Sequence, residues 1–470
     1  MFSPSSWSRW LLVVSAVSVL ACSDDDPGSQ GQPSEVEDAS TPPADAEAKP
    51  PSENEDGTDP LPPLPEDQTL PIVFVHGFAG SAQQFQSQAM RFVMNGYPAE
   101  RLRAYEHDGA GMAGMSFVTG LDAVVDEVRA KFSTDKVFLV GHSRGTSVSL
   151  MYLSDPGRAA KVEKYVALDG AGCANIPVPC RAPAQTVNTR PGQTDPLPGQ
   201  KHVEVATSKE AFAIQFEFFF GRKAEVIDIV KQRAPVVISG RAVNFPANTG
   251  RDGVTLEFWE LDSKTGKRSK DEPLAKFTLG AEGTWGPVTV DPEKHYEQVL
   301  KSPDVANQHH FYSQPFLRSS EFVRLLSGPP DSDSRKNTNS GPNHAAIVMM
   351  RQREWTTDDA LEVSTKSPGG DQAAKNAITP AITNNPISIF LHDDAATPKE
   401  SSLGPLPWFP TQPFQNGVDV FMPAKETPDG TITLTNKPRG ATDRPQTLNV
   451  PNWASSLHTI TVTFNDFPQD

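Results

Sequence analysis

The chain has 470 residues and a formal net charge of −16 at pH 7, from 58 acidic and 42 basic side chains. Its length exceeds that of one ordinary domain, so we expect two or three. The acidic balance and the absence of a basic patch argue against nucleic acid as a partner.

The first 22 residues have the pattern of an export signal. Arg9 precedes a short apolar run, Trp10 to Ala21, as in a secretory signal peptide. Val19-Leu20-Ala21-Cys22 resembles the bacterial lipobox, in which the cysteine becomes the lipidated first residue. We therefore expect an exported lipoprotein anchored to the membrane through Cys22. Ser23, rather than an aspartate, follows and favours the outer membrane or cell surface. A secreted protein with an ordinary signal peptide is the alternative.

Residues 23–69 have the composition of a linker. They contain fourteen Asp or Glu residues and one Lys, so most of the net charge belongs to this segment. Low hydrophobicity with many Pro, Ser and Glu cannot offset the entropy of ordering. We expect a disordered, self-repelling tether between the membrane and the folded domains.

Alternating β and α patterns from residue 70 to residue 233 predict an α/β domain. Such alternation is typical of a mostly parallel sheet with helices on both faces, in which reacting groups gather at the carboxyl ends of the strands. A last helix begins at a capping box of Thr207 and Glu210 and ends at Gly221. The other expected elements are strands at 72–75, 101–105, 136–140 and 164–168 and helices at 82–95, 121–132 and 146–154.

Gly141-His142-Ser143-Arg144-Gly145 has the G-x-S-x-G pattern of a nucleophile elbow. A buried β-branched strand precedes it and a helix follows it, which is the context that this turn requires. We therefore expect Ser143 to be a nucleophile. A glycine-rich structural turn is the alternative.

A serine hydroxyl needs a base, and the base needs an oriented acid. Of the ten histidines, only His107 and His202 lie in loops of the α/β domain outside the two motif turns. The order Ser…Asp…His selects His202, which follows Ser143. Asp169 ends the strand after the nucleophile's helix and is the expected acid. Asp195, in the loop before His202, is the alternative acid.

Two backbone N–H groups are expected to bind the developing oxyanion. One belongs to Arg144, at the start of the helix, and the other to Phe78, which follows Gly77 in the first loop. The side chains at these positions should matter less than the peptide geometry.

Cys173 and Cys180 are the only cysteines besides Cys22. An isolated pair in an exported protein most simply forms a disulfide, with two free thiols as the alternative. We expect neither a metal site nor an organic cofactor.

From residue 234 the pattern changes to short strands separated by turns. Residues 234–328, the first β module, are expected to form a small antiparallel, sandwich-like domain. Residues 329–470, the second β module, begin with a polar linker and form a second β-rich domain. The expected strands are 236–243, 254–260 and 274–279 in the first module and 386–391, 430–435 and 458–464 in the second.

Residues 70–233 resemble lipase-type α/β hydrolases. The resemblance rests on His76-Gly77-Phe78-Ala79-Gly80, the 141–145 elbow, Leu168-Asp169-Gly170 and His202-Val203. An acid in this position, together with C-terminal β modules, is similar to one group of secreted lipases, whose archaeal members carry a β domain proposed to engage lipid. The resemblance implies carboxylester hydrolysis through an acyl-enzyme.

The implied substrate is a lipid or another hydrophobic ester, with the β modules binding a lipid or polymer surface. The chain departs from the family in lacking a long amphipathic lid, and segments 109–120 and 173–180 are the only apolar candidates for one. Two other functions remain open: an extracellular polyester depolymerase, and a non-catalytic surface-binding lipoprotein.

Overall fold

The computed structural model describes residues 61–185, 192–233, 235–303, 305–329, 331–380, 382 and 385–468. The predicted signal peptide, the predicted lipidation site Cys22 and most of the predicted tether lie outside these residues. The last residues of the predicted tether are ordered, contrary to the predicted disorder. Leu64 is buried, and its N–H donates to the Gly96 carbonyl. Residues 61–69 therefore pack on the α/β domain. Among the described residues, no helix is long and apolar enough to cross a membrane.

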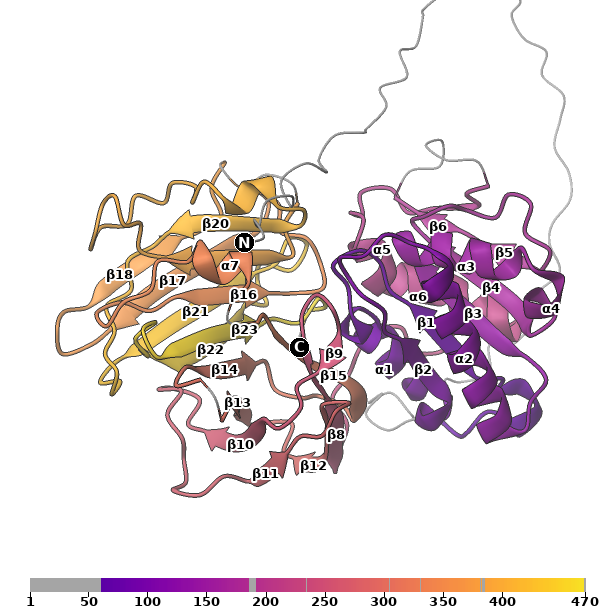
Figure 1. Cartoon of the computed structure of the whole chain (residues 1–470), viewed down its shortest axis with the longest axis horizontal. Coiled ribbons are helices and arrows are strands. Elements are labelled where there is room, and N and C mark those ends of the chain that lie inside the picture. Colours follow the sequence, from indigo (N-terminus) through magenta and orange to yellow (C-terminus); the bar gives the residue numbers. More distant parts are fainter. Residues whose placement is uncertain are drawn as a thin grey trace, which may run out of the picture. The chain divides into compact units, whose positions relative to one another are not determined.

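The α/β domain has a five-stranded parallel sheet in the order β2-β1-β3-β4-β5 (Figure 1). This order confirms the predicted α/β fold with a mostly parallel sheet. The strands are β1 (Ile72–Val75), β2 (Leu102–Tyr105), β3 (Val137–His142), β4 (Val162–Leu168) and β5 (Cys180–Arg181). The helices are α1 (Gln86–Met94), α2 (Met115–Phe132), α3 (Arg144–Leu153), α4 (Pro156–Ala159), α5 (Glu204–Thr207) and α6 (Lys209–Phe220).

Side chains that alternate along β1 face two separate cores, as the period of a strand requires. Ile72 and Phe74 pack in one core with aromatic residues of α1 and α6, including Phe212. Val73 and Val75 pack in the other core with residues of α2 and α3. Both faces of the sheet are therefore covered by helices, and the central strands β1 and β3 are buried along their whole length. In such sheets, reacting groups gather at the carboxyl ends of the strands.

The predicted cap of the last helix is off by one residue. Ser208, not Thr207, caps α6, because its Oγ accepts the N–H of Ala211. Thr207 instead ends the short helix α5, which the sequence pattern does not reveal. The predicted stop at Gly221 is confirmed, since Gly221 has a φ of 68° and ends α6 in the left-handed conformation.

The β modules form three larger sheets. The first module contributes a four-stranded sheet of β12 (Thr284–Val290), β8 (Val236–Asn244), β15 (Ser320–Ser327) and β9 (Thr249–Gly250). The second contributes a sheet of β18 (Gln372–Asn376), β17 (Ala360–Lys366), β21 (Thr431–Lys437) and β22 (Gln446–Pro451). The pairing in the first module is mixed rather than purely antiparallel, because β15 runs parallel to β8.

An eight-stranded sheet contains strands from both β modules. Its last strand in the sequence, β23, lies between β14 and β16 and runs parallel to both. The sheet order is β11 (Ala275–Thr278), β10 (Thr255–Leu261), β13 (His295–Lys301), β14 (Gln308–Ser313), β23 (His458–Thr463), β16 (Ile347–Met350), β19 (Ser388–His392) and β20 (Gln415–Asp419). The remaining elements are a two-stranded ladder, β6 (Pro183–Ala184) with β7 (Asp195–Pro196), and α7 (Asp333–Lys336).

Candidate active site

Ser143 lies on the turn between β3 and α3 with a strained backbone. Its φ of 52° and ψ of −121° are uncommon for a residue with a side chain. The turn closes tightly because a Cβ on Gly145 would lie 2.1 Å from the Val75 carbonyl oxygen, and one on Gly141 would lie 2.9 Å from the Gly145 oxygen. The two glycines thus allow the close approach that presents the serine at the end of the sheet.

The structure brings Ser143, His202 and Asp169 together in one hydrogen-bonded line. The Oγ of Ser143 is 2.8 Å from Nε2 of His202, and Nδ1 of His202 is 2.5 Å from Oδ2 of Asp169. Gln185, which the sequence does not single out, donates its backbone N–H to Asp169 Oδ1 at 3.1 Å. With Nδ1–H of His202 donating to the carboxylate, Nε2 is free to accept the serine proton.

The charges around this line favour an ionised acid. Burial raises the pKa of the Asp169 carboxyl, but the hydrogen bond and charge of His202 outweigh burial and leave this pKa below its ordinary value. Burial and the neighbouring His202 lower the pKa of His142 to about 3, so His142 is neutral. Its Nε2–H donates to the His202 carbonyl at 2.9 Å and fixes the backbone of that residue.

The first loop places Gly77, the residue before Phe78, beside the nucleophile. Gly77 lies against the elbow, because a Cβ there would come within 2.9 Å of Ser143 Cβ. His76 is buried, and burial together with His107 lowers the pKa of His76 to about 3. Its Nε2 accepts the His107 N–H at 3.2 Å, so its Nδ1–H donates to the Gly77 carbonyl at 2.9 Å.

This contact with the Gly77 carbonyl orients the next N–H. The C=O and N–H of a trans peptide point in opposite directions. The hydrogen bond from His76 to the Gly77 carbonyl therefore points the Phe78 N–H away from His76. The second expected donor, the Arg144 N–H, starts α3, and the first N–H groups of a helix have no partner within the helix.

The Arg144 side chain has a role that the sequence did not indicate. Its guanidinium donates to the Asp108 carbonyl at 2.7 Å and to the Gly111 carbonyl. It also lies 5.4 Å from the centre of the Phe78 ring. Through these contacts the Arg144 side chain holds segment 108–111 beside the elbow.

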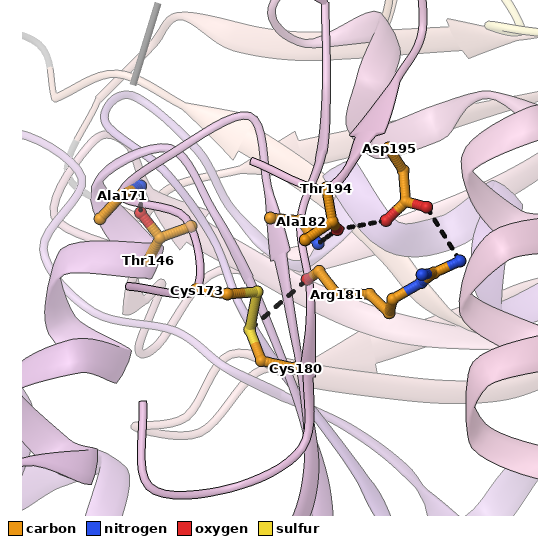
Figure 2. The surroundings of a disulfide bond; sticks show 8 residues. All are labelled: Thr146, Ala171, Cys173, Cys180, Arg181, Ala182, Thr194 and Asp195. Atoms are coloured by element: carbon orange, nitrogen blue, oxygen red, sulfur yellow. Dashed lines mark hydrogen bonds and ion pairs between the residues drawn. A yellow bond between two sulfur atoms is a disulfide. The ribbon is translucent and has the colours of Figure 1, made fainter. Parts of the chain in front are cut away.

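The two rejected candidates lie elsewhere. His107 stacks on His76, and its Nε2 contacts the His76 carbonyl at 3.1 Å rather than the serine. Asp195 forms an ion pair with Arg181 at 3.0 Å and accepts from the Thr194 hydroxyl (Figure 2). Asp195 is thus occupied by side chains other than His202.

Cys173 and Cys180 form a disulfide, as predicted (Figure 2). The bond closes the loop that leads from β4 to β5. Among the described residues, no group of three or more His, Cys, Asp or Glu side chains is arranged to hold a metal ion.

A cavity of about 630 Å³ begins at Phe78 and Ala79 and extends along the β modules. This volume is within the range of roughly 300–1,000 Å³ that small-molecule sites occupy. Its apolar wall includes Leu326, Val348, Phe390 and Trp408. Two exposed apolar side chains, Met112 at 89% and Met115 at 60%, lie in or next to the segment that Arg144 fastens.

Three family models match the chain, and the first two overlap over residues 234–265. Residues 72–265 match the alpha/beta hydrolase family, and residues 234–330 match a lipase C-terminal domain. Residues 333–468 match a further C-terminal domain. No curated protein sequence matches the chain.

Solved structures show weak likeness. The mature form of lipase BlEst2 from Bacillus licheniformis is 26% identical over 24% of this chain, with a TM-score of 0.19; the match spans 45% of that lipase. Its propeptide form is 14% identical over 84% of this chain and 95% of its own, with a TM-score of 0.27. The hypothetical protein PA1622 from Pseudomonas aeruginosa PAO1 is 19% identical over 22% of this chain and 36% of its own, with a TM-score of 0.16.

Proposed function

Because the chain is a lipase-type α/β hydrolase with C-terminal domains, we propose that it is an exported serine esterase or lipase that cleaves hydrophobic carboxylic esters. The observation that carries this proposal is the hydrogen-bonded line of Ser143, His202 and Asp169. A scaffold that only binds a surface has no need of such a line.

The proposed reaction follows from these contacts. Nε2 of His202 takes the Ser143 proton as Oγ attacks the ester carbonyl, and the N–H groups of Phe78 and Arg144 bind the oxyanion. The tetrahedral intermediate then expels the alcohol, which takes the proton from His202, and an acyl-enzyme remains. A water molecule, deprotonated by His202, attacks the acyl-enzyme to give a second tetrahedral intermediate. This intermediate expels Ser143 Oγ, which takes the proton back from His202, and the carboxylic acid leaves. Asp169 holds the imidazole and stabilises its positive charge.

Apolar surface near the oxyanion loop supports a hydrophobic substrate. The cavity begins at Phe78, which is both a proposed oxyanion donor and a wall residue. We assign this cavity to the hydrophobic acyl chain of the ester. The exposed Met112 and Met115 extend the apolar surface on the side of Arg144 and suit contact with lipid.

The disulfide supports the export part of the proposal, because such bonds persist in oxidising compartments outside the cytosol. We propose that Cys22 carries the lipid anchor and that the β modules contact a lipid or polymer surface. Mass spectrometry of the mature N-terminus tests the anchor: a diacylglyceryl group on Cys22 is expected, and an unmodified N-terminus at another residue would contradict it.

A fluorophosphonate probe tests the enzyme assignment. We expect labelling of the wild type and of Ser154→Ala, a control at the exposed end of α3, but none of Ser143→Ala. An unlabelled wild type, or equal labelling of Ser143→Ala, would refute it. Rates with p-nitrophenyl esters of increasing length should rise with acyl length, and Val348→Trp should lower them only for long chains.

A further inference from the structure

Each β module inserts one buried polar side chain into the backbone of an active-site loop. Glu354 comes from the second β module and Asn248 from the first, and these side chains are 1% and 5% exposed. Among the described residues, neither side chain forms a hydrogen bond with Ser143 or with the imidazole of His202.

Glu354 caps the backbone that follows His202. Its carboxylate accepts the N–H of Val203 at 2.5 Å and the N–H of Glu204 at 3.0 Å. These N–H groups begin α5, whose capping residue Val203 has no polar side chain. The carboxylate therefore supplies the cap that a serine or aspartate would give in an ordinary helix.

The peptide between His202 and Val203 is held from both sides. His142 donates to its carbonyl oxygen at 2.9 Å, while Glu354 accepts from its N–H. A peptide fixed at both ends cannot rotate without breaking one of the two hydrogen bonds. Because this peptide carries the His202 Cα, its orientation determines where Nε2 points.

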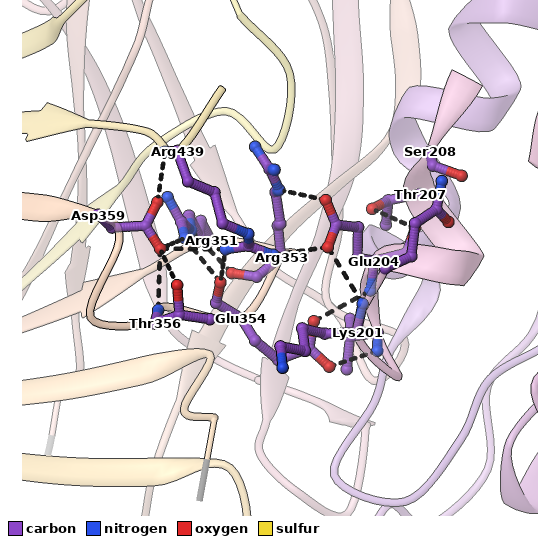
Figure 3. A network of polar contacts seen from close by, with 12 residues as sticks. Lys201, Glu204, Thr207, Ser208, Arg351, Arg353, Glu354, Thr356, Asp359 and Arg439 are labelled. Carbon is purple, nitrogen blue, oxygen red and sulfur yellow. Dashed lines mark hydrogen bonds and ion pairs between the residues drawn. The ribbon is translucent and has the colours of Figure 1, made fainter. Parts of the chain in front are cut away.

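An ion-pair network keeps the Glu354 segment against α5 (Figure 3). Arg353 and Arg439 bind the two carboxylate oxygens of Glu204 at 2.7 and 2.6 Å. Arg439 also contacts Asp359 at 3.0 Å, and Asp359 pairs with the fully buried Arg351 at 2.8 Å. Arg353, directly before Glu354, is thus anchored to α5, and Arg351, three residues before Glu354, is anchored within the second β module.

Asn248 holds the other loop in a comparable way. Its Nδ2 donates to the carbonyls of Gly80 and His107, each at 2.9 Å. The neighbouring Pro246 carbonyl accepts the Gly109 N–H at 2.7 Å. This turn of the first β module therefore ties together the two segments that carry His76 and His107, whose contact orients the Phe78 N–H.

We propose that Glu354 and Asn248 are positioning residues for ester hydrolysis, the first aligning the base and the second aligning the oxyanion loop. This inference rests on the proposed function. It gives the β modules a part in the chemical step itself, in addition to any contact with the substrate. The C-terminal modules are then required even for small soluble esters that need no docking surface.

The test uses the full chain with Glu354→Gln, which keeps the size but places an NH₂ group against a backbone N–H. Asn248→Gly removes the donor and suits the residue's φ of 58°. The control is Glu362→Gln, because Glu362 on β17 is a partly exposed carboxylate that pairs with Lys437. With p-nitrophenyl butyrate, we expect kcat to fall by up to about 100-fold in both positioning variants, because misplacement by about 1 Å costs that much. KM should stay within threefold, and the control should match the wild type.

Titration with a fluorophosphonate separates positioning from folding. The positioning variants should bind the same stoichiometric amount of probe as the wild type, at a lower rate. A kcat equal to that of the wild type would overturn the inference. So would a lower activity that comes only from a smaller amount of probe-reactive enzyme, with the turnover per reactive site unchanged. A wild type that does not react with the probe would instead refute the proposed function, so the two failures are distinct.

Discussion

Replacing Glu106 by Gln removes a negative charge that joins the α/β domain to the first β module. Glu106 follows β2, and its side chain is 5% exposed. It accepts from Arg324 Nε at 3.0 Å and from Arg241 at 2.8 Å, and its Oε1 also accepts the Ala82 N–H. The substitution keeps the shape of the side chain but leaves two buried arginines facing a neutral amide, so we expect a loss of stability.

The size of that loss follows from the pKa of Glu106. Burial raises this pKa, but Arg324, the Ala82 N–H and Arg241 outweigh burial and lower it from 4.5 to about 2. At 1.36 kcal/mol for each pH unit, the shift corresponds to on the order of 3 kcal/mol of stability at pH 7. Breaking a buried ion pair costs a similar amount, about 3–5 kcal/mol.

The sign of the pH dependence is also fixed. A carboxyl whose folded pKa is lowered contributes its full stability above the ordinary value of 4.5 and loses it as the pH falls toward 2. The advantage of the wild type over Glu106→Gln should therefore be nearly constant from pH 5.5 to 7. It should shrink to roughly three quarters of its neutral value at pH 4 and to roughly two fifths at pH 3.

Urea unfolding followed by tryptophan fluorescence measures this difference, since Trp285 is buried in the core of the first β module. Glu293→Gln is a matched control, because Glu293 is 67% exposed in its pair with Lys231 and should contribute little. An advantage that does not change between pH 7 and pH 3, or one no larger than that of the control, would refute the reasoning.

Three further predictions follow from other contacts. Asp169→Asn should lower kcat by about 10⁴-fold, the loss in a known triad, because the amide favours the wrong imidazole tautomer. An unchanged kcat in steady-state kinetics would contradict this prediction. Gly77→Ala should abolish esterase activity while circular dichroism stays native, because the new Cβ would lie 2.9 Å from Ser143 Cβ. Replacing Cys173 and Cys180 by Ser should cost about 2.5 kcal/mol, from the entropy of a loop with a separation of 7 residues. Calorimetry would contradict this last prediction if Tm did not fall.

The residues that the structure brings together were accessible from sequence because each follows a local signal. Ser143 and Asp169 come directly after buried strands, and parallel strands align their carboxyl ends at one edge of the sheet. His202 precedes a helix whose phenylalanine stripe identifies the face that packs on the sheet. Short-range patterns and one topological rule therefore suffice to place these three side chains near one another.

The supporting residues lack such signals. Glu354 lies 151 residues from Val203 and Asn248 lies 141 residues from His107, and neither is part of a local motif. Their role depends on how the β modules pack against the loops, which no periodicity encodes. The Ser208 cap was missed for a smaller reason: Thr207 and Ser208 are both good capping residues, and only the tertiary turn of α5 decides between them.

The pairing of β23 determines which experiment can assign a role to the β modules. Deleting the second module removes β23 and leaves β14 as an open sheet edge, and it also removes Glu354. A truncated chain would thus lose activity whether the modules bind substrate or align the active site. Substitutions separate the two roles. Val348→Trp narrows the cavity, whereas Glu354→Gln weakens the hydrogen bonds that hold the backbone after His202 and lies outside the cavity wall. Val348→Trp should slow the hydrolysis of long esters alone, whereas Glu354→Gln should slow the hydrolysis of every ester. If the rates of both variants depended on acyl-chain length in the same way, the cavity would not bind the acyl chain.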